Sequence, residues 1–309
     1  MLKIFITTYK LNYLLSLCFL FTCTLAMGQL PYVSNGKIER LALTSKYIPS
    51  RPVDVWLPDN YDADTKYNVL YMQDGQMLFD STITWNHQEW HVEETIQRLI
   101  NGKNIPPTIV VAIHNIARIR YAEYVPKNIV LPSNLVHLFT EKLNDTTDAN
   151  KYLKFITKEL KPYIDQHYST KSDALHTFIA GSSMGGLMSM YAMCEYPKVF
   201  GGAICMSTHW PGGDPTNIKL ANAMFHGFKT YLEDHLSKLK SNKFYFDYGS
   251  ATLDSFYAPY QKQIDRLFKK ENNRNIAYLS RYFEGDAHDE KAWSMRFLIP
   301  CCWMMQAEE

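Results

Sequence analysis

Short apolar stretches recur along this chain, and segments with helical periodicity lie between them. Stretches rich in β-branched and aromatic residues and bounded by turn-forming residues predict buried strands. The predicted strands are residues 53–57, 68–72, 108–113, 177–180, 202–206, 243–248 and 277–283. Apolar residues repeat at helical spacing in residues 91–100 and 151–168. Strands that alternate with helices predict an α/β protein with a mainly parallel sheet and helices on both faces.

The rest of the chain shows no sign of a second domain. No repeat, low-complexity run or Pro/Gly-rich linker interrupts residues 29–309, so the sequence predicts one domain there. Hydrophobic residues make up 46% of the chain and charged residues 20%, which suits a sizeable core.

The first 28 residues have the features of an export signal. Lys3 and Lys10 precede an apolar stretch from Leu11 to Ala26, and Ala26-Met27-Gly28 offers small residues for cleavage. The stretch is short for a membrane span of about 20 residues and no basic cluster follows it, so no stable membrane anchor is expected after cleavage. We therefore expect an exported protein, periplasmic or secreted, that begins near Gln29.

Charge and cysteine content exclude some function classes. Loss of residues 1–28 removes two lysines and no acidic residue, which changes the net charge from +1 to −1 and disfavours nucleic acid as a partner. Cys194, Cys205, Cys301 and Cys302 remain, and their spacing fits no metal site. Cys194 and Cys205 are expected to be buried apolar side chains, with a disulfide open to them in an exported protein.

The strongest chemical signal is Gly181-Ser182-Ser183-Met184-Gly185, a G-x-S-x-G sequence between a predicted strand and a helix. A serine on so sharp a turn needs neighbours without side chains, and the two glycines meet that need. Ser183 is therefore the candidate nucleophile. The backbone N–H of Met184, at the start of the helix, is the first candidate donor to an oxyanion.

A serine nucleophile needs a base, and the base needs an orienting acid. Of the histidines downstream, His288 alone lies in a loop after a late strand, so it is the candidate base. Asp254, in the loop after the preceding strand, is the preferred acid. Asp247, inside that strand, is the alternative, and Asp286 is expected to be a turn residue. For the second oxyanion donor we predict the N–H of Gln76, next to Gly75 in the loop after an early strand.

A possible metal site is dismissed. His87 and His91 are four residues apart, but a zinc protease needs glutamate directly after the first histidine, and Gln88 stands there. The sequence predicts neither a metal nor a cofactor.

With these residues in place, the chain resembles the putative esterase family of α/β-hydrolases, which includes esterase D, feruloyl and acetylxylan esterases, enterochelin esterases and mycolyltransferases. The matching stretches are residues 55–58, 70–80, 118–126, 181–186, 247–249 and 285–290. The resemblance implies an α/β-hydrolase fold, with Ser183 as nucleophile and His288 as base. Where the family often has Thr-Glu after Asp-Tyr-Gly, this chain has Ser250-Ala251, which favours Asp254 as the acid. Arg120 and Glu123 match a charged pair near the pocket, which we expect to be a structural salt bridge.

These observations predict an exported serine esterase that forms an acyl-enzyme. Trp85 and Trp210 fall in loops expected near the site and are candidate platforms for a sugar or an aromatic acyl group, although packing in the core would explain them equally well. An acetylated or feruloylated carbohydrate is the preferred substrate. Two alternatives stay open: an acyltransferase that uses the same residues, and a non-catalytic ligand-binding protein.

Overall fold

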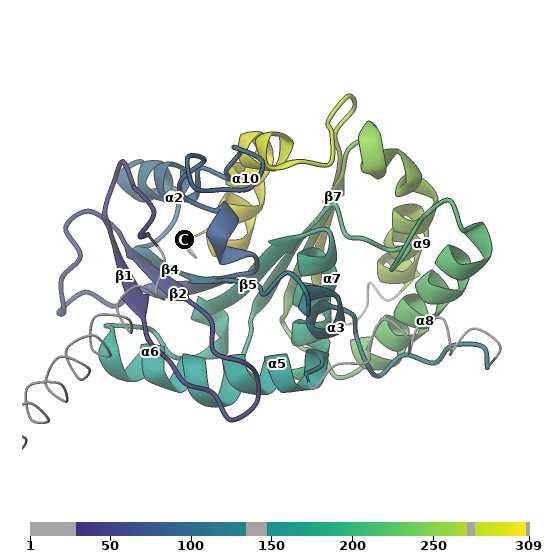
Figure 1. Ribbon diagram of the computed structural model, residues 1–309, viewed down its shortest axis with the longest axis horizontal. Coiled ribbons are helices and arrows are strands. Elements are labelled where there is room, and N and C mark those ends of the chain that lie inside the picture. The colour runs from purple at the N-terminus through teal and green to yellow at the C-terminus, as the bar shows by residue number, and fades with distance from the viewer. Residues whose placement is uncertain (1–28, 134–146, 271–275, 307–309) are drawn as a thin grey trace, which may run out of the picture. The chain divides into compact units, whose positions relative to one another are not determined.

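A single eight-stranded sheet organises the computed structural model, which describes residues 29–133, 147–270 and 276–306 (Figure 1). The strands are β1 (Lys37–Leu41), β2 (Val53–Leu57), β3 (Asn68–Met72), β4 (Thr108–Ile113), β5 (Thr177–Ser182), β6 (Gly202–Met206), β7 (Lys243–Tyr248) and β8 (Ala277–Tyr282). Their order across the sheet is β1-β2-β4-β3-β5-β6-β7-β8. β1 and β2 pair antiparallel with their neighbours, and every pair from β4 to β8 is parallel. The prediction of a mainly parallel sheet is confirmed.

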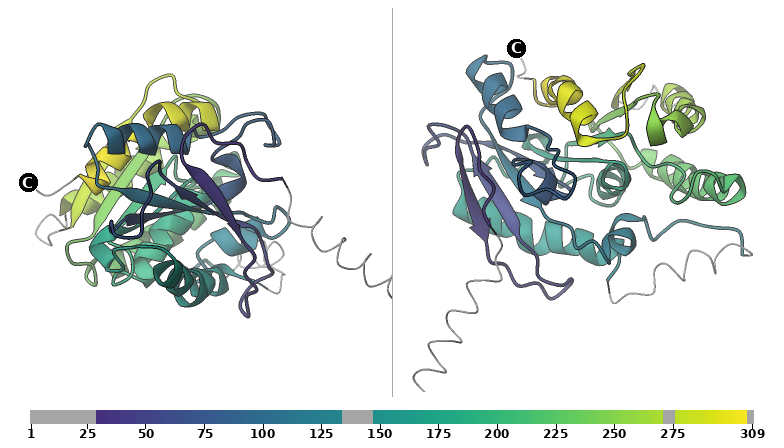
Figure 2. Two further views of the ribbon diagram at one scale, coloured as in Figure 1. Left: turned by 90° about the vertical axis from the view of Figure 1, so that its left-hand side faces the viewer. Right: turned by 45° about the horizontal axis from the view of Figure 1, so that its top comes forward.

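Helices cover both faces of this sheet, as predicted. Side chains alternate between the faces, so Leu70 and Met72 pack with α2 (Val92–Asn101) and α10 (Glu290–Met305). Val69 and Tyr71 instead join a larger core on the opposite face. The helices that contribute to it are α3 (Arg120–Tyr124), α5 (Ala149–Phe155), α6 (Lys161–His167), α7 (Met184–Glu195), α8 (Ile218–Leu236) and α9 (Ala258–Lys270). Figure 1 shows α5 and α6 below the sheet, and Figure 2 shows α2 beside α10 on the other side.

The seven predicted strands all form, with small shifts at their ends. The helix expected at residues 91–100 is α2, and the helix expected at 151–168 is the continuous run of α5, a π-helical turn (Ile156–Leu160) and α6. Pro162, at the start of α6, has no N–H to donate to that turn. β1 was not predicted, because this edge strand is only partly buried and its sequence lacks a continuous apolar run.

Two predictions concern the extent of the folded domain and the first residues of the chain. The described residues from Tyr32 onward form one compact unit. The predicted export signal, residues 1–28, lies outside the described residues. Within residues 29–133, 147–270 and 276–306, no helix is long and apolar enough to cross a membrane.

Cys194 and Cys205 are buried, as predicted, and both thiols are free.

α2 contains a buried acid that should make stability depend on pH. The Glu93 side chain is 1% exposed, and burial, with Glu94 beside it, raises the pKa of Glu93 from 4.5 to about 9. A raised folded-state pKa stabilises the fold below pH 4.5, and that contribution is lost as the pH rises towards 9. We therefore expect the free energy of unfolding to fall by several kcal/mol between pH 5 and pH 9, at about 1.4 kcal/mol per pKa unit.

Glu93→Gln keeps the shape of this side chain and removes its titration. Urea unfolding at pH 5, 7 and 9 should show that the variant loses much less stability than the wild type as the pH rises. Glu284→Gln, in an exposed loop, is the control and should follow the wild type. Parallel pH dependences for the wild type and Glu93→Gln would contradict this prediction.

Candidate active site

Ser183 occupies the turn between β5 and α7 in a backbone conformation rare for any residue with a side chain. Its φ is 56° and its ψ is −122°. The Ser183 N–H donates to the Met206 carbonyl at 2.9 Å, and the Ser183 carbonyl accepts the N–H of His209 at 3.1 Å. Neighbouring backbone therefore holds this strained turn in place, as strained functional positions require.

The two glycines of G-x-S-x-G are needed for close packing. A Cβ at Gly181 would lie 2.7 Å from the Gly185 carbonyl carbon and 2.9 Å from Gln73 Cγ. A Cβ at Gly185 would lie 3.1 Å from Gln73 Cβ. A side chain at Gly181 would therefore collide with the backbone of α7, and one at Gly185 would crowd the Gln73 side chain.

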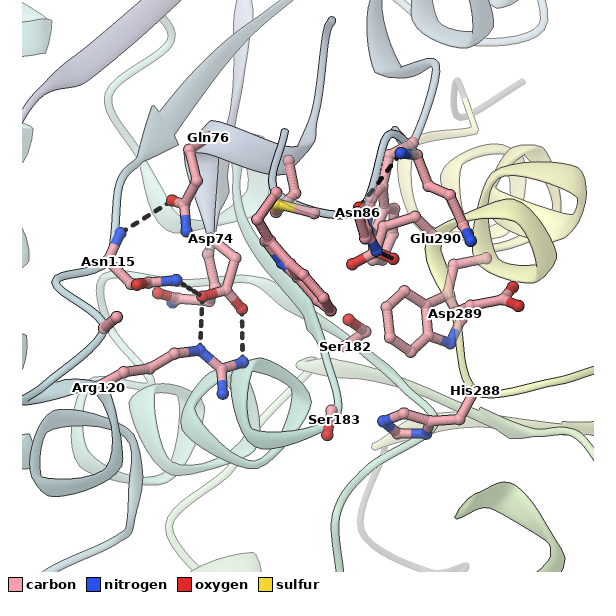
Figure 3. Close-up of a pocket in the computed structure, with 17 residues that line it drawn as sticks. Asp74, Gln76, Asn86, Asn115, Arg120, Ser182, Ser183, His288, Asp289 and Glu290 are labelled. Carbon is pink, nitrogen blue, oxygen red and sulfur yellow. Dashed lines mark hydrogen bonds and ion pairs between the residues drawn. The ribbon is translucent and has the colours of Figure 1, made fainter. Parts of the chain in front are cut away.

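Ser183 opens onto a cavity of about 660 Å³ (Figure 3). The wall combines loops that follow β3, β4, β5 and β8 with the beginning of α10, so the carboxyl ends of several parallel strands meet there. Such an edge is where α/β proteins place their ligand sites. The residues that line the cavity are Gln73, Asp74, Gln76, Met77, Trp85, Asn86, Gln88, Trp90, Asn115, Ala117, Arg120, Ser182, Ser183, His288, Asp289, Glu290 and Trp293.

His288 lies in the loop between β8 and α10, with its imidazole on the Ser183 side of the cavity (Figure 3). Its backbone N–H donates to Thr252 Oγ1 at 2.8 Å. His288 Nδ1 lies 2.6 Å from Asp254 Oδ1, and Asp254 is fully buried. The other oxygen, Asp254 Oδ2, accepts the Gly249 N–H at 2.6 Å. The structure thus brings together the three residues proposed from the sequence as nucleophile, base and acid.

Asp247, the alternative acid, has other partners. It pairs with Arg296, whose Nη2 is 3.1 Å from Oδ1 and whose Nε is 3.2 Å from Oδ2. Burial raises the pKa of Asp247 above its usual range, and Arg296 opposes that rise. Asp286 also binds Arg296, at 2.8 Å, while its carbonyl accepts the backbone N–H groups of Ser250 and Ala251. Asp254 is therefore the carboxylate in contact with His288.

The two candidate oxyanion donors come from different segments of the chain. Met184 is the first residue of α7, and Gln76 lies in a short 3-10 turn (Gly75–Met77) that lines the cavity. The Gln76 side chain accepts the Asn115 N–H at 3.1 Å, which fixes the turn to the loop after β4. A Cβ at Gly75 would lie 2.6 Å from the Ala112 carbonyl carbon, so glycine is needed for the turn to pack against β4.

The expected Arg120–Glu123 salt bridge is wrong, because each residue pairs elsewhere. Arg120 binds Asp74 through two contacts of 2.7 Å, at the cavity wall (Figure 3). Glu123 binds Arg51 at 2.6 and 2.7 Å in the core. Residues three apart on a helix can meet, but here the two side chains face different surroundings.

The two tryptophans predicted as platforms have different environments. Trp85 is 82% exposed at the cavity, so it is available to a ligand. Trp210 is fully buried, its indole N–H donates to Gln261 at 2.8 Å, and its ring packs on Phe246. A buried indole whose N–H is satisfied belongs to the core. The prediction of a platform at Trp210 is therefore wrong.

Two residues at the site were not identified from the sequence. Trp293 of α10 lines the cavity and packs edge-on against His288, with ring centroids 5.0 Å apart. Tyr257 also packs edge-on against His288, with ring centroids 5.6 Å apart, and its hydroxyl lies 2.6 Å from His209 Nδ1. Their closeness in sequence to the candidate acid and base was the only local signal for them.

The hydrogen-bond direction between Tyr257 and His209 follows from their surroundings. Burial lowers the pKa of His209 to about 4, so its ring is neutral near pH 7. His209 Nε2 lies 2.9 Å from the Gly213 carbonyl, which can only accept, so Nε2 carries the proton. Nδ1 then accepts the Tyr257 hydroxyl proton. Burial raises the pKa of Tyr257, the nearby Asp254 carboxylate raises it further, and Ser183 lowers it.

Comparison with known proteins identifies the family. Residues 47–298 match the family described as "Putative esterase", and the chain belongs to that family. The uncharacterized protein YjcH of Bacillus subtilis is 24% identical over 176 residues, which are 57% of this chain and 63% of that protein. An endo-1,4-beta-xylanase/feruloyl esterase of Xylanibacter ruminicola is 26% identical over 203 residues, 60% of this chain and 24% of that protein. The match thus spans less than two thirds of these relatives' own lengths.

The fold matches solved structures over most of its length. A feruloyl esterase module from Clostridium thermocellum, solved as a mutant with sinapinate bound, aligns with a TM-score of 0.61 at 17% identity. The alignment covers 91% of this chain and 93% of the module. This likeness supports the expected α/β-hydrolase fold.

Proposed function

We propose that this protein is an exported serine carboxylic-ester hydrolase that uses Ser183, His288 and Asp254. The observation that carries the proposal is the arrangement at the cavity: Ser183 on a strained turn, His288 on the same cavity wall, and a buried Asp254 bonded to His288 Nδ1. Membership of the esterase family supports it. Export is proposed from the charge and apolar pattern of residues 1–28.

The contacts of His288 support a role for each residue in the proposed reaction. Asp254 is hydrogen-bonded to His288 Nδ1. The proton of the Ser183 hydroxyl therefore passes to His288 Nε2 as Ser183 Oγ attacks the ester carbonyl. The N–H groups of Met184 and Gln76 stabilise the oxyanion, and one such donor is typically worth about 10²- to 10³-fold in kcat. His288 then protonates the leaving alcohol. Water, activated by the same imidazole, attacks the acyl-enzyme and regenerates Ser183 Oγ–H.

Active-site labelling tests this proposal directly. Residues 29–309 should hydrolyse p-nitrophenyl acetate, and a fluorophosphonate should inactivate the enzyme by labelling one serine. Peptide mass spectrometry should place the adduct on Ser183. A protein that neither turns over the ester nor reacts with the probe, or an adduct on another serine, would refute the mechanism.

For the substrate we propose an acetylated or feruloylated carbohydrate. The exposed Trp85 ring at the cavity supports this proposal, because a flat apolar ring with a polar edge suits both sugar and aromatic faces. The polar side chains of Asn86, Gln88 and Glu290 lie at the same wall and offer hydrogen bonds to hydroxyl groups. The names of the Xylanibacter and Clostridium proteins, a xylanase/feruloyl esterase and a feruloyl esterase module, are consistent with it.

Trp85→Ala should raise KM for feruloyl- and acetyl-oligosaccharides by about two- to tenfold, because a lost stacking contact is worth about 0.5–1.5 kcal/mol. Its kcat/KM for p-nitrophenyl acetate should stay near the wild-type value, since that small ester does not need the platform. Leu175→Ala is the control, because Leu175 is exposed just before β5, at the end of the strand away from Ser183. Hydrolysis of oligosaccharide esters no faster than that of the simple ester would reject the carbohydrate proposal.

A further inference from the structure

Ser207 is a fully buried serine with an unusual backbone conformation close to the candidate acid. It follows β6 directly, and its φ is 42°, a value that favours glycine. Its N–H is 3.0 Å from Asp247 Oδ1 and 2.9 Å from the Asp247 carbonyl. These contacts keep Ser207 in a strained conformation, which suggests that its side chain is needed where it lies.

The direction of the Ser207 hydrogen bonds is determined by its neighbours. Trp293 Nε1 lies 3.0 Å from Ser207 Oγ, and Arg296 Nη2 lies 2.8 Å from the same oxygen. An indole N–H and a guanidinium can only donate. Both lone pairs of the hydroxyl are therefore used, and its single proton points to Asp254 Oδ2, which is 2.6 Å away.

The hydrogen bond from the Ser207 hydroxyl fixes the orientation of the Asp254 carboxylate. Oδ2 accepts both the Ser207 hydroxyl and the Gly249 N–H, and Oδ1 is the atom that faces His288 Nδ1. We propose that Ser207 is a positioning residue for ester hydrolysis: its hydroxyl holds the Asp254 carboxylate so that one oxygen is reserved for His288. The proposal rests on the serine-esterase function proposed above.

The same hydroxyl connects the acid to α10, which forms part of the cavity wall. Trp293 and Arg296 of α10 both bind Ser207, and Trp293 also contacts His288 and the cavity. Arg296 in turn binds Asp247 and Asp286, which lie in β7 and in the loop before His288. Ser207 is thus the point at which the segments carrying the acid, the base and the cavity wall meet.

Two substitutions distinguish the effect of the Ser207 hydroxyl from the effect of the strained backbone at this position. Ser207→Ala removes the hydroxyl and keeps the strained φ, whereas Ser207→Gly removes the hydroxyl and relieves the strain. We expect both variants to lose about 10²-fold in kcat on p-nitrophenyl acetate with little change in KM, because a small misplacement of a catalytic group has a cost of that size. Ser294→Ala is the control: Ser294 is next to Trp293 on α10, and its hydroxyl donates to the Lys291 carbonyl.

Two further readouts distinguish positioning from folding. In both variants the acid limb of the pH profile of kcat/KM should move to higher pH, because Asp254 without the Ser207 donor holds the imidazole proton more tightly. A loss of folded protein would instead lower kcat/KM at every pH without moving the limb. The downfield proton resonance of the His288–Asp254 bond should be present in the wild type and shifted in both variants. Circular dichroism should show that Ser207→Gly is folded.

A Ser207→Gly variant with kcat within twofold of the wild type and an unmoved acid limb would overturn the proposal. If the wild type hydrolyses no ester, the proposed function fails, and the proton resonance alone then decides whether Ser207 positions Asp254. An unchanged resonance in both variants would overturn the inference independently of turnover.

Discussion

Ser183→Ala is expected to lower kcat for p-nitrophenyl acetate by at least about 10⁴-fold, the range found when a triad nucleophile is removed. Alanine can keep the positive φ of this turn at no greater strain than serine, so the fold and the N–H of Met184 should stay in place. KM should therefore change far less than kcat. The measurement is steady-state kinetics on folded protein, with fluorophosphonate labelling as the second readout.

The adjacent serine provides a matched control. Ser182 also lines the cavity, but it is the last residue of β5 and not the residue at the turn. Ser182→Ala should retain activity within about tenfold of the wild type and should still be labelled at Ser183. Comparable losses in the two variants, or turnover that survives in Ser183→Ala, would contradict the assignment of Ser183.

Asp254→Asn is expected to lower kcat by about 10⁴-fold, as when the acid of a triad becomes an amide. The Gly249 N–H and the Ser207 hydroxyl both donate to Oδ2, so the amide oxygen must take that place. The amide NH₂ then faces His288 Nδ1 and makes it an acceptor. The imidazole proton moves to Nε2, and His288 can no longer accept the proton of Ser183.

Asp247→Asn separates this effect from a structural one. Asp247 is buried and paired with Arg296, and breaking a buried ion pair typically costs about 3–5 kcal/mol. We expect urea unfolding to show that loss, while kcat per folded molecule falls by less than about tenfold. The reverse pattern, a stable but inactive Asp247→Asn and an active Asp254→Asn, would make Asp247 the acid.

Local features of the sequence determined much of the fold and most of the candidate site. The seven predicted strands follow from short apolar runs, because strands buried on both faces need apolar side chains at successive positions. Gly181 and Gly185 mark the turn at Ser183, because a side chain at Gly181 would collide with backbone and one at Gly185 would crowd Gln73. Asp254 and His288 could be proposed from their places after consecutive late strands, since parallel strands bring such loops to one edge of the sheet.

Contacts between distant segments decided the rest, and no local pattern encodes them. Trp85 and Trp210 look alike in sequence, but only packing against Gln261 and Phe246 shows that Trp210 belongs to the core. Arg120 meets Asp74, 46 residues away, and not its helical neighbour Glu123. The role proposed for Ser207 depends on Asp254 and Trp293, which are 47 and 86 residues away. A hydroxyl shows its direction only when every donor around it is known, and here both donors come from α10, far from Ser207 in the sequence.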